Sequence, residues 1–390
     1  MYSTDAWVIR SGSQVGTLDG DPGKALLREV FTFGPLAEGE ALVEPILGSW
    51  EANIDHALAR WPIDICSTRG EDAAILGNLG VVRVLAARPS PESPPVRAGD
   101  LCLLMPFGKL DRHGYAELVH GYDCPNTLGL LAKRSKMSAR LLLPIPTGTE
   151  YSLAQWATYG RYFTAWDNWH RALGCWRTQV PDDDPAGHLV FGWGGGVSLA
   201  QLTLAKRDGF RVAMTASSDE RLAFLDRQGV VGIDRRRFPH LAVAQRRGGA
   251  DSESPLAHKE SMAEFLRVIS ELSDGYGVSI FVDNIGEPLY KATTNSLARA
   301  GVVTACGWKA GMRISHLRAG ECINRHIQVN THVWRFSESA AIRDFQQSAG
   351  WIAPEDSTVV YDFDQVPQLA RDYARGSISP YFPLYSINPV

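Results

Sequence analysis

The sequence predicts an α/β protein with two domains: an antiparallel, barrel-like domain and a parallel sheet with helices on both faces. Three observations support this fold class. Short strands with turn signals recur through the first part of the chain. A glycine-dense turn then joins a strand to a helix. Beyond that turn, strands and helices alternate, which is typical of a parallel sheet covered on both faces.

The first domain is expected to be built from short strands. The segment 25–30 fits a strand or a short helix, and residues 40–47 alternate in polarity as a strand does. Pro and Ser are frequent in 88–97, which we expect to be a connection. Further strands are predicted at 81–86, 101–105 and 114–119.

The second domain begins where the pattern changes, after Leu142-Leu143-Pro144-Ile145-Pro146, and Ser152 can cap a helix over 153–173. Strands are predicted at 189–191, 210–214, 278–282, 301–305 and 327–333, and helices at 197–205, 265–272 and 289–300. A helix at 337–350 and a strand at 358–361 follow, in the C-terminal part of the chain. We therefore assign residues 1–152 to the first domain and 153–334 to the second, with 335–390 returning to the first.

The stretch from His188 to Gly229 predicts the first half of a dinucleotide-binding βαβ unit. Its strand and helix are joined by a turn that contains Gly192, Gly194, Gly195 and Gly196, followed by Val197. Glycines let the backbone pass close to a pyrophosphate, and unpaired N–H groups at the start of a helix attract its negative charge. Because each glycine costs backbone entropy, four of them in five residues would suit an ordinary connection poorly. A purely structural turn is the alternative.

The end of the second strand of this unit indicates NADP(H) rather than NAD(H). NAD-selective sites usually place Asp or Glu there, where the carboxylate binds the ribose 2′-hydroxyl and repels a 2′-phosphate. This chain has Ala216 instead, followed by Ser217, Ser218 and then Arg221, which can all donate to a phosphate. The serines also suit the cap of the next helix, and the two roles are compatible.

Composition and charge exclude several classes of protein. The net charge of −4 gives no sign of nucleic-acid or membrane binding. No apolar run approaches the ~18 residues of a membrane span, and the polar start of the chain predicts no secretion signal. The six cysteines are scattered without a CxxC pair, which is typical of free thiols in a reducing cytoplasm.

Several motifs occur in a fixed order over roughly residues 40–385. They are Gly77-Asn78-Leu79-Gly80-Val81-Val82, Gly99-Asp100, Gly114-Tyr115-Ala116-Glu117, Leu143-Pro144-Ile145-Pro146, Thr164-Ala165-Trp166 and the glycine turn. Together they resemble the medium-chain dehydrogenase/reductase superfamily, which implies a GroES-like β-barrel catalytic domain and a Rossmann cofactor domain. Asp283-Asn284-Ile285-Gly286 and Val329-Asn330-Thr331-His332 look most like the zinc-independent branch, which contains enoyl-CoA reductases and crotonyl-CoA carboxylase/reductases.

The resemblance also bears on zinc. Zinc-dependent members carry Gly-His-Glu where this chain has Gly77-Asn78-Leu79, and they place a Cys ligand near the position of Glu51. Catalytic zinc needs three protein ligands, so the resemblance implies a site without metal. Glu51, His56 and Cys66 could supply ligand atoms, which leaves an unorthodox metal site as an alternative.

The expected reaction follows from this lack of zinc. Carbonyl–alcohol interconversion without zinc loses its usual means of stabilising an alkoxide. Reduction of a C=C bond conjugated to a carbonyl needs hydride at the β-carbon, hydrogen bonds to the enolate and a proton for the α-carbon. The resemblance therefore implies an NADPH-dependent, zinc-independent reductase of an α,β-unsaturated carbonyl compound or an enoyl thioester, with secondary metabolism as a candidate setting. Three alternatives remain: an alcohol or polyol dehydrogenase with atypical or absent zinc, a reductive carboxylase of an enoyl-CoA, and a protein that binds nucleotide without turnover.

Candidate catalytic residues lie in the loop that faces the nicotinamide in related proteins. Carboxylating relatives have Asn-x-Asn where this chain has Asn53-Ile54-Asp55, and a carboxylate there opposes the binding of CO2. Asp55 or His56 is the expected proton donor, although His56 also fits an ordinary helix. Tyr162 and Tyr115 are further candidate donors, with a packing role as the alternative.

Other residues are expected to bind the cofactor or the substrate. Related folds place the cofactor at strand ends and at the entry helix, which here carry Thr164, Asn284, Gly307, Trp308 and Thr331. Arg69 and Arg161 could bind an acyl-carrier phosphate, but ion-paired or solvated arginines are the preferred interpretation. The superfamily is commonly dimeric through the edge of the nucleotide-domain sheet, so a homodimer is expected.

Overall fold

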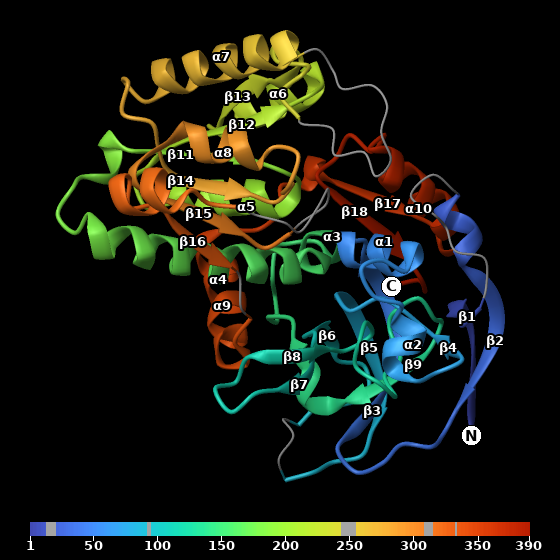
Figure 1. Ribbon diagram of the computed structural model, residues 1–390. Helices are drawn as coiled ribbons and strands as arrows, with labels where there is room; N and C mark the ends of the chain where they lie inside the picture. Colours follow the sequence, from blue (N-terminus) through green and yellow to red (C-terminus); the bar gives the residue numbers. More distant parts are fainter. Residues whose placement is uncertain (13–20, 92–94, 243–254, 308–314, 332–333) are drawn as a thin grey trace. The chain divides into compact units, whose positions relative to one another are not determined.

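The computed structural model describes residues 1–12, 21–91, 95–242, 255–307, 315–331 and 334–390. They form two compact units (Figure 1). Unit 1 consists of Met1–Phe163 and Trp334–Val390, and unit 2 consists of Thr164–Val333.

The boundary between the units differs from the sequence assignment, which began the second domain at residue 153. Residues 153–163 belong to unit 1 because they bond to it. Gln155 Nε2 donates to the carbonyl of Ala353 at 2.8 Å, and the Tyr159 hydroxyl donates to the carbonyl of Ser339 at 2.8 Å.

The main sheet of unit 1 has the order β10-β6-β5-β3-β18-β17, and β9 also pairs with β3. Its strands are β3 (Glu40–Ser49), β5 (Gly80–Ala87), β6 (Leu101–Leu104), β9 (Ser135–Ser138), β10 (Leu142–Pro144), β17 (Thr358–Tyr361) and β18 (Phe382–Ser386). A smaller sheet holds β1 (Tyr2–Arg10), β2 (Leu27–Phe33) and β4 (Ala73–Ala74), and a hairpin joins β7 (Phe107–Leu110) to β8 (Ala116–Val119). The pairs are antiparallel, as expected, except for β17 with β18, which are parallel.

The helices of unit 1 are α1 (Ala52–Ala59), α2 (Ile65–Arg69), α3 (Leu153–Ala157), the start of α4 (Tyr159–Gln179), α9 (Ser339–Ala349) and α10 (Val366–Arg375). The prediction of one helix over 153–173 was wrong at Thr158. The Thr158 hydroxyl donates to the carbonyl of Gln155 at 2.6 Å, and the chain divides into α3 and α4 there. The expected cap is confirmed, because Ser152 and Gln155 form a capping box.

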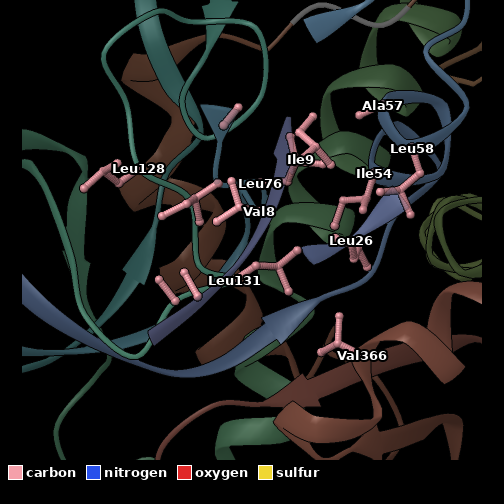
Figure 2. Packing of buried hydrophobic residues seen from close by; sticks show 14 of the residues in the cluster. Val8, Ile9, Leu26, Ile54, Ala57, Leu58, Leu76, Leu128, Leu131 and Val366 are labelled. Carbon is pink, nitrogen blue, oxygen red and sulfur yellow. The ribbon is translucent and has the colours of Figure 1, made fainter. Parts of the chain in front are cut away.

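The core of unit 1 fixes the orientation of α1. Figure 2 shows Ile54, Ala57 and Leu58 of α1 in a buried cluster with residues of β1 and with Val366 of α10. Since these three side chains occupy the buried face of a short helix, Asn53, Asp55 and His56 lie on its half-buried faces.

The sheet of unit 2 has the order β13-β12-β11-β14-β15-β16, and all its pairs are parallel. Its strands are β11 (Leu189–Trp193), β12 (Arg211–Ala216), β13 (Val231–Asp234), β14 (Val278–Asp283), β15 (Leu297–Ala305) and β16 (Gln328–Thr331). The helices are the rest of α4, α5 (Gly196–Arg207), α6 (Asp219–Arg227), α7 (Pro255–Leu272) and α8 (Tyr290–Ser296). In Figure 1, α4 and α7 lie on opposite sides of this sheet, as the α/β prediction required.

Two bounds in unit 2 differ from the predictions. Helix α8 ends at Ser296, not at residue 300, because β15 begins at Leu297. Ala300 has φ of +62°, a left-handed conformation that neither a regular helix nor a regular strand contains. Helix α7 begins at Pro255, well before the predicted 265, and Met262 and Phe265 of this helix pack in the core with Phe191 and Phe281 of the sheet.

Short helical turns complete the fold. They are η1 (Pro22–Ala25), η2 (Ala139–Leu141), η3 (Pro185–Gly187), η4 (Arg235–Arg237), the π-helical η5 (Arg318–Asn324), η6 (Phe336–Glu338), η7 (Glu355–Ser357) and η8 (Phe363–Gln365). Within the described residues, every helix is too short or too polar to span a membrane.

Candidate functional site

The glycine turn lies between β11 and α5, where the strand order of unit 2 reverses from β11 to β14. Gly194 has φ of +138°, and a Cβ there would lie 2.5 Å from Ser198 Oγ. Gly195 is the N-cap of α5, and a Cβ on it would meet no atom within 4 Å. No side chain among the described residues caps α5, so the N–H groups of Gly196 and Val197 at its start are available to an anion.

Gly192 has a different role, which is to allow close packing. A Cβ on this buried glycine would lie 3.3 Å from Leu202 of α5 and 3.3 Å from Val282 of β14. The glycines of the turn therefore divide between helix packing and an open approach to the start of α5.

A hydrogen-bond network joins the ends of three strands beside the turn. Asn284 Nδ2 donates to Ser198 Oγ at 2.7 Å, and the Ser198 hydroxyl donates to the carbonyl of Trp193 at 3.2 Å. Asn284 Oδ1 accepts from the backbone N–H of Cys306 at 2.9 Å and from its thiol at 3.0 Å. Gly307 follows directly, and a Cβ on it would lie 3.5 Å from the Asn284 carbonyl oxygen. This network fixes the positions of Asn284 and Gly307 at the carboxyl edge of the sheet.

The loop after β14 is held by the buried carboxylate of Asp283. This carboxylate accepts from the N–H groups of Ile285 at 3.1 Å and Gly286 at 2.9 Å, and from the hydroxyl of Thr293 at 2.7 Å. Burial raises the pKa of Asp283, and these hydrogen bonds oppose the rise. The result is a rigid loop that presents Asn284 to the glycine turn.

The end of β12 carries no acid, as the sequence indicated. Ser218 caps α6, and its hydroxyl accepts from the N–H of Arg221 at 3.3 Å, while Ser217 lies half-buried at the strand end. Asp219, in the first turn of α6, is ion-paired with Arg236, which also lies 2.8 Å from Asp234. This edge therefore offers hydroxyl and cationic groups, and the carboxylates of Asp219 and Asp234 share an ion pair with Arg236.

Only some of the residues that were predicted to bind the cofactor lie together in the structure. Thr164 is buried in α4, and Thr331 ends β16, where it pairs with Ala305 beside Cys306. The glycine turn, Asn284 and Gly307 are brought together directly. Trp308 lies outside the described residues.

A second polar cluster lies in unit 1, around α1. Asn53 Nδ2 donates to Asn78 Oδ1 at 3.2 Å. Arg161 Nε donates to Ser49 Oγ at 3.1 Å and lies 3.6 Å from Glu51 Oε1. Burial raises the pKa of Glu51, and the Arg161 guanidinium opposes the rise. Burial also raises the pKa of Tyr373 to about 12, and Arg161, Asp55 and Glu51 act on this hydroxyl as well. These residues form what we call the Arg161 cluster: Ser49, Glu51, Asn53, Asn78, Arg161 and Tyr373.

The predicted proton donors are not equally placed. Asp55 and His56 are half-buried on α1 next to the Arg161 cluster, and the His56 ring lies 6.3 Å from that of Trp61. The ring of Tyr162 is 4.8 Å from that of Trp351 and 5.8 Å from that of Phe382, which supports the packing alternative.

The other tyrosine and arginine candidates are held by structural partners. The hydroxyl of Tyr115 accepts from Arg335 Nη2 at 2.5 Å. Arg69 lies 2.7 Å from Glu71 and donates to the carbonyls of Tyr122 and Thr127. Arg161 is also ion-paired, as the preferred interpretation expected.

The three residues considered as metal ligands do not form one site. Cys66 is buried in the apolar core of unit 1, where its thiol donates to the carbonyl of Ile9 at 3.6 Å. Glu51 is paired with Arg161, and a guanidinium beside it opposes a metal cation. Across the described part of the chain, no three His, Cys, Asp or Glu side chains lie close enough to share a metal ion.

Several residues of these sites were not predicted. The roles of Ser198, Cys306 and Arg236 depend on which strands become neighbours, and each is a common residue in an ordinary position. One signal was available for Ser198: it follows the glycine turn on the first turn of α5.

The sequence matches no protein-family model and no curated relative. Solved structures do match. The crotonyl-CoA carboxylase/reductase AntE in complex with NADP is 20% identical, with 98% of this chain and 94% of that chain covered and a TM-score of 0.76. The 2-octenoyl-CoA carboxylase reductase CinF in complex with NADP and 2-octenoyl-CoA is 17% identical, with 98% and 87% covered and a TM-score of 0.76.

An alcohol dehydrogenase has the same fold. The thermostable enzyme from Pyrobaculum aerophilum is 16% identical, with 99% of this chain and 100% of that chain covered and a TM-score of 0.71. This chain therefore has the fold of the medium-chain dehydrogenases/reductases, a GroES-like unit with a Rossmann unit, and the expected fold class is confirmed.

Proposed function

We propose that this protein is an NADPH-dependent reductase of a C=C bond conjugated to a carbonyl group, in an enoyl thioester or an enone, and that it works without zinc. The observation that carries the proposal is the start of α5, where Gly195 leaves open space and no described side chain caps the helix. It lies where the strand order of the parallel sheet reverses, the usual place for a dinucleotide in such sheets.

The cofactor fits the residues present. The pyrophosphate would be held by the N–H groups of Gly196 and Val197, and Asn284 and Gly307 would line the same edge. Ser217, the Ser218 hydroxyl and Arg221 would hold a 2′-phosphate, which no free acid at the end of β12 would repel among the described residues. When bound, NADPH supplies the hydride.

The reaction class is supported by the polar cluster of unit 1 and by the structural relatives. AntE and CinF act on enoyl-CoA thioesters according to their names. In this chain Arg161 Nη2 and Asn78 Nδ2 have no acceptor among the described residues, so the cluster offers hydrogen-bond donors to a substrate oxygen. Asp55 or His56, on the adjacent faces of α1, would deliver the proton to the α-carbon.

Assembly and location are also proposed. Strand β16 lies at the edge of the unit 2 sheet. Val329 on this strand is 38% exposed, and Leu317 and Ile323, which precede the strand in the chain, are 71% and 59% exposed, which favours a homodimer through this edge. The six cysteines are free, and free thiols are typical of a reducing compartment, which supports the proposal of a cytoplasmic protein.

The test is oxidation of NADPH by crotonyl-CoA, by 2-octenoyl-CoA and by a simple enone, each with EDTA present. We expect turnover with at least one of them and much weaker use of NADH. Activity that disappears with EDTA and returns with Zn²⁺ would favour an alcohol or polyol dehydrogenase instead. Tight NADPH binding without turnover of any enone, enoyl thioester or aldehyde would favour a nucleotide-binding protein without catalysis.

Reductive carboxylation is the second candidate, since AntE and CinF are carboxylase/reductases. The carboxylate of Asp55, on α1 beside Asn53, opposes it, because a carboxylate repels a developing carboxylate. Mass spectrometry of the product, formed with and without bicarbonate, distinguishes the two reactions. We expect the saturated thioester in both cases.

A further inference from the structure

Six side-chain nitrogens of unit 1 are buried without an acceptor among the described residues: Trp50 Nε1, Arg69 Nε, Asn78 Nδ2, Arg161 Nη2, Arg335 Nε and Gln346 Nε2. Two of them, Arg161 Nη2 and Asn78 Nδ2, belong to the Arg161 cluster. Arg161 is 6% exposed and Asn78 is 1% exposed. A buried donor that lacks a partner costs about 1–3 kcal/mol, and an ordered water or a ligand that accepts from it removes this cost. Here two such donors occur in the same polar cluster.

Contacts of Leu79 and Ser49 connect the two donors. The side chain of Leu79 lies against Gly160, where even a single Cβ would clash with it. The carbonyl of Leu79 accepts from the N–H of Ser49 at 2.9 Å, and Ser49 Oγ accepts from Arg161 Nε at 3.1 Å. Asn78 precedes Leu79 in the chain, and Arg161 follows Gly160. Because Leu79 contacts Gly160, Asn78 and Arg161 lie on adjoining segments of the chain.

Each of these two side chains is positioned by hydrogen bonds to its neighbours, and each keeps one nitrogen that has no acceptor among the described residues. Arg161 is positioned through its Nε by Ser49 and Glu51, which leaves Nη2 unused. Asn78 is positioned through its Oδ1, which accepts from Asn53, and this leaves Nδ2 unused. Donors fixed in this way lose little entropy when an acceptor arrives.

Arg161 is the cation of this cluster, and Glu51 and Asp55 are the acidic residues near it. Burial raises the pKa of Glu51, so the negative charge of this carboxyl group is disfavoured. Tyr373, whose pKa burial raises to about 12, is neutral at physiological pH. A buried cation with an unused donor, beside an amide with an unused donor, is suited to an oxygen on which negative charge develops.

We propose that Arg161 is a catalytic residue which, together with Asn78, donates hydrogen bonds to the carbonyl oxygen of the substrate. This inference rests on the proposed function. Hydride addition to the β-carbon breaks the C=C π bond, whose electron pair forms a new double bond between the α-carbon and the carbonyl carbon. The carbonyl π pair moves to oxygen, which becomes the anion that Arg161 and Asn78 stabilise. A proton then adds to the α-carbon, and the carbonyl re-forms.

The role explains how the reaction proceeds without a metal. A guanidinium supplies the positive charge that a Lewis acid would otherwise supply, and it needs no ligand set. An acyl-carrier phosphate is a poorer match for this position, because it is a large, highly charged group that would need several donors near the protein surface.

The closing experiment compares Arg161→Met and Arg161→Lys with a control, Arg69→Lys. Arg69 is also a buried arginine of unit 1 in an ion pair, and its Nε also lacks an acceptor among the described residues, but its two terminal nitrogens donate to backbone carbonyls. We expect kcat to fall about 100- to 1,000-fold in Arg161→Met, as when an oxyanion-stabilising donor is removed, and less in Arg161→Lys. The Kd for NADPH should be unchanged in all three variants, and kcat should be unchanged in Arg69→Lys even if it melts at a lower temperature.

A binding measurement keeps the inference independent of turnover. 4-Nitrophenol, whose phenolate resembles an enolate, is titrated into the NADP⁺-loaded protein, and its ionisation is followed by visible absorbance. We expect the wild type to lower the pKa of the bound phenol and Arg161→Met to abolish that shift. If the shift survives in Arg161→Met, the inference is wrong even when the enzyme reduces enoyl thioesters. If the wild type reduces no conjugated C=C bond, the proposed function is wrong, and the oxyanion role falls with it whatever the phenol shows.

Discussion

Replacement of Gly195 by alanine tests whether a pyrophosphate crosses the glycine turn. In the structure the new methyl group meets no atom within 4 Å, and Gly195 has φ of −112°, which alanine also adopts. The protein should therefore fold and melt as the wild type does. A bound pyrophosphate would be displaced by the methyl group and would lose one or two charge-assisted hydrogen bonds from the start of α5, worth about 1.5–3 kcal/mol each.

A loss of about 3 kcal/mol corresponds to roughly 100-fold weaker binding of NADPH. Calorimetric titration of NADPH gives the Kd, and a thermal melt of the free protein gives the stability. Gly187→Ala is the matched control, because it precedes β11, at the opposite end of that strand, and its Cβ also meets nothing within 4 Å. If Gly195→Ala binds NADPH as tightly as the wild type, the reasoning about the turn is refuted.

Three further predictions follow from other parts of the chain. Ser217→Asp places a carboxylate at the end of β12, so the Kd for NADPH should rise at least about tenfold while that for NADH does not rise; equal effects on both cofactors would argue against a 2′-phosphate site there. Burial lowers the pKa of His120 from 6.5 to about 4. Between these two pH values the unfolded chain therefore binds a proton at His120 that the folded protein does not. The free energy of unfolding should fall as the pH drops from 6.5 to 4, by about 3 kcal/mol in total. Urea unfolding across that range should show a clearly smaller slope in His120→Gln, and an unchanged slope would assign the effect to other groups. Gly160→Ala drives a methyl group into Leu79 and should destabilise unit 1 by about 1–3 kcal/mol, whereas Gly174→Ala, also on α4 but with open space, should not lower the melting temperature.

The fold was predictable where local pattern and tertiary structure agree. The glycine turn between β11 and α5 is specified by adjacent residues, and the alternation of strands and helices after it implies the parallel sheet. The predictions failed where a local feature competes with the pattern. Thr158 ends α3 through one side-chain hydrogen bond, and β15 begins at Leu297 inside a segment with helical spacing.

The candidate site was predictable in part for the same reason. The residues at the glycine turn and at the end of β12 follow from the βαβ unit, because the unit itself places them. The Arg161 cluster could not be predicted from the βαβ unit, since Arg161 and Ser49 are 112 residues apart and meet only after β3 and α4 have packed in unit 1. No spacing rule relates such residues, so a sequence alone gives Arg161 only as one arginine on a helix.

The position of β18 has a consequence for the order of events during synthesis. This strand lies between β3 and β17, and its Tyr385 fills the space beside Gly48. The ribosome makes β3 before the whole of unit 2 and β18 after it, so the barrel stays open along that seam while the nucleotide unit is already complete. We expect ribosome-stalled nascent chains that end just after unit 2 to retain NADPH on an affinity column while the barrel is still susceptible to protease.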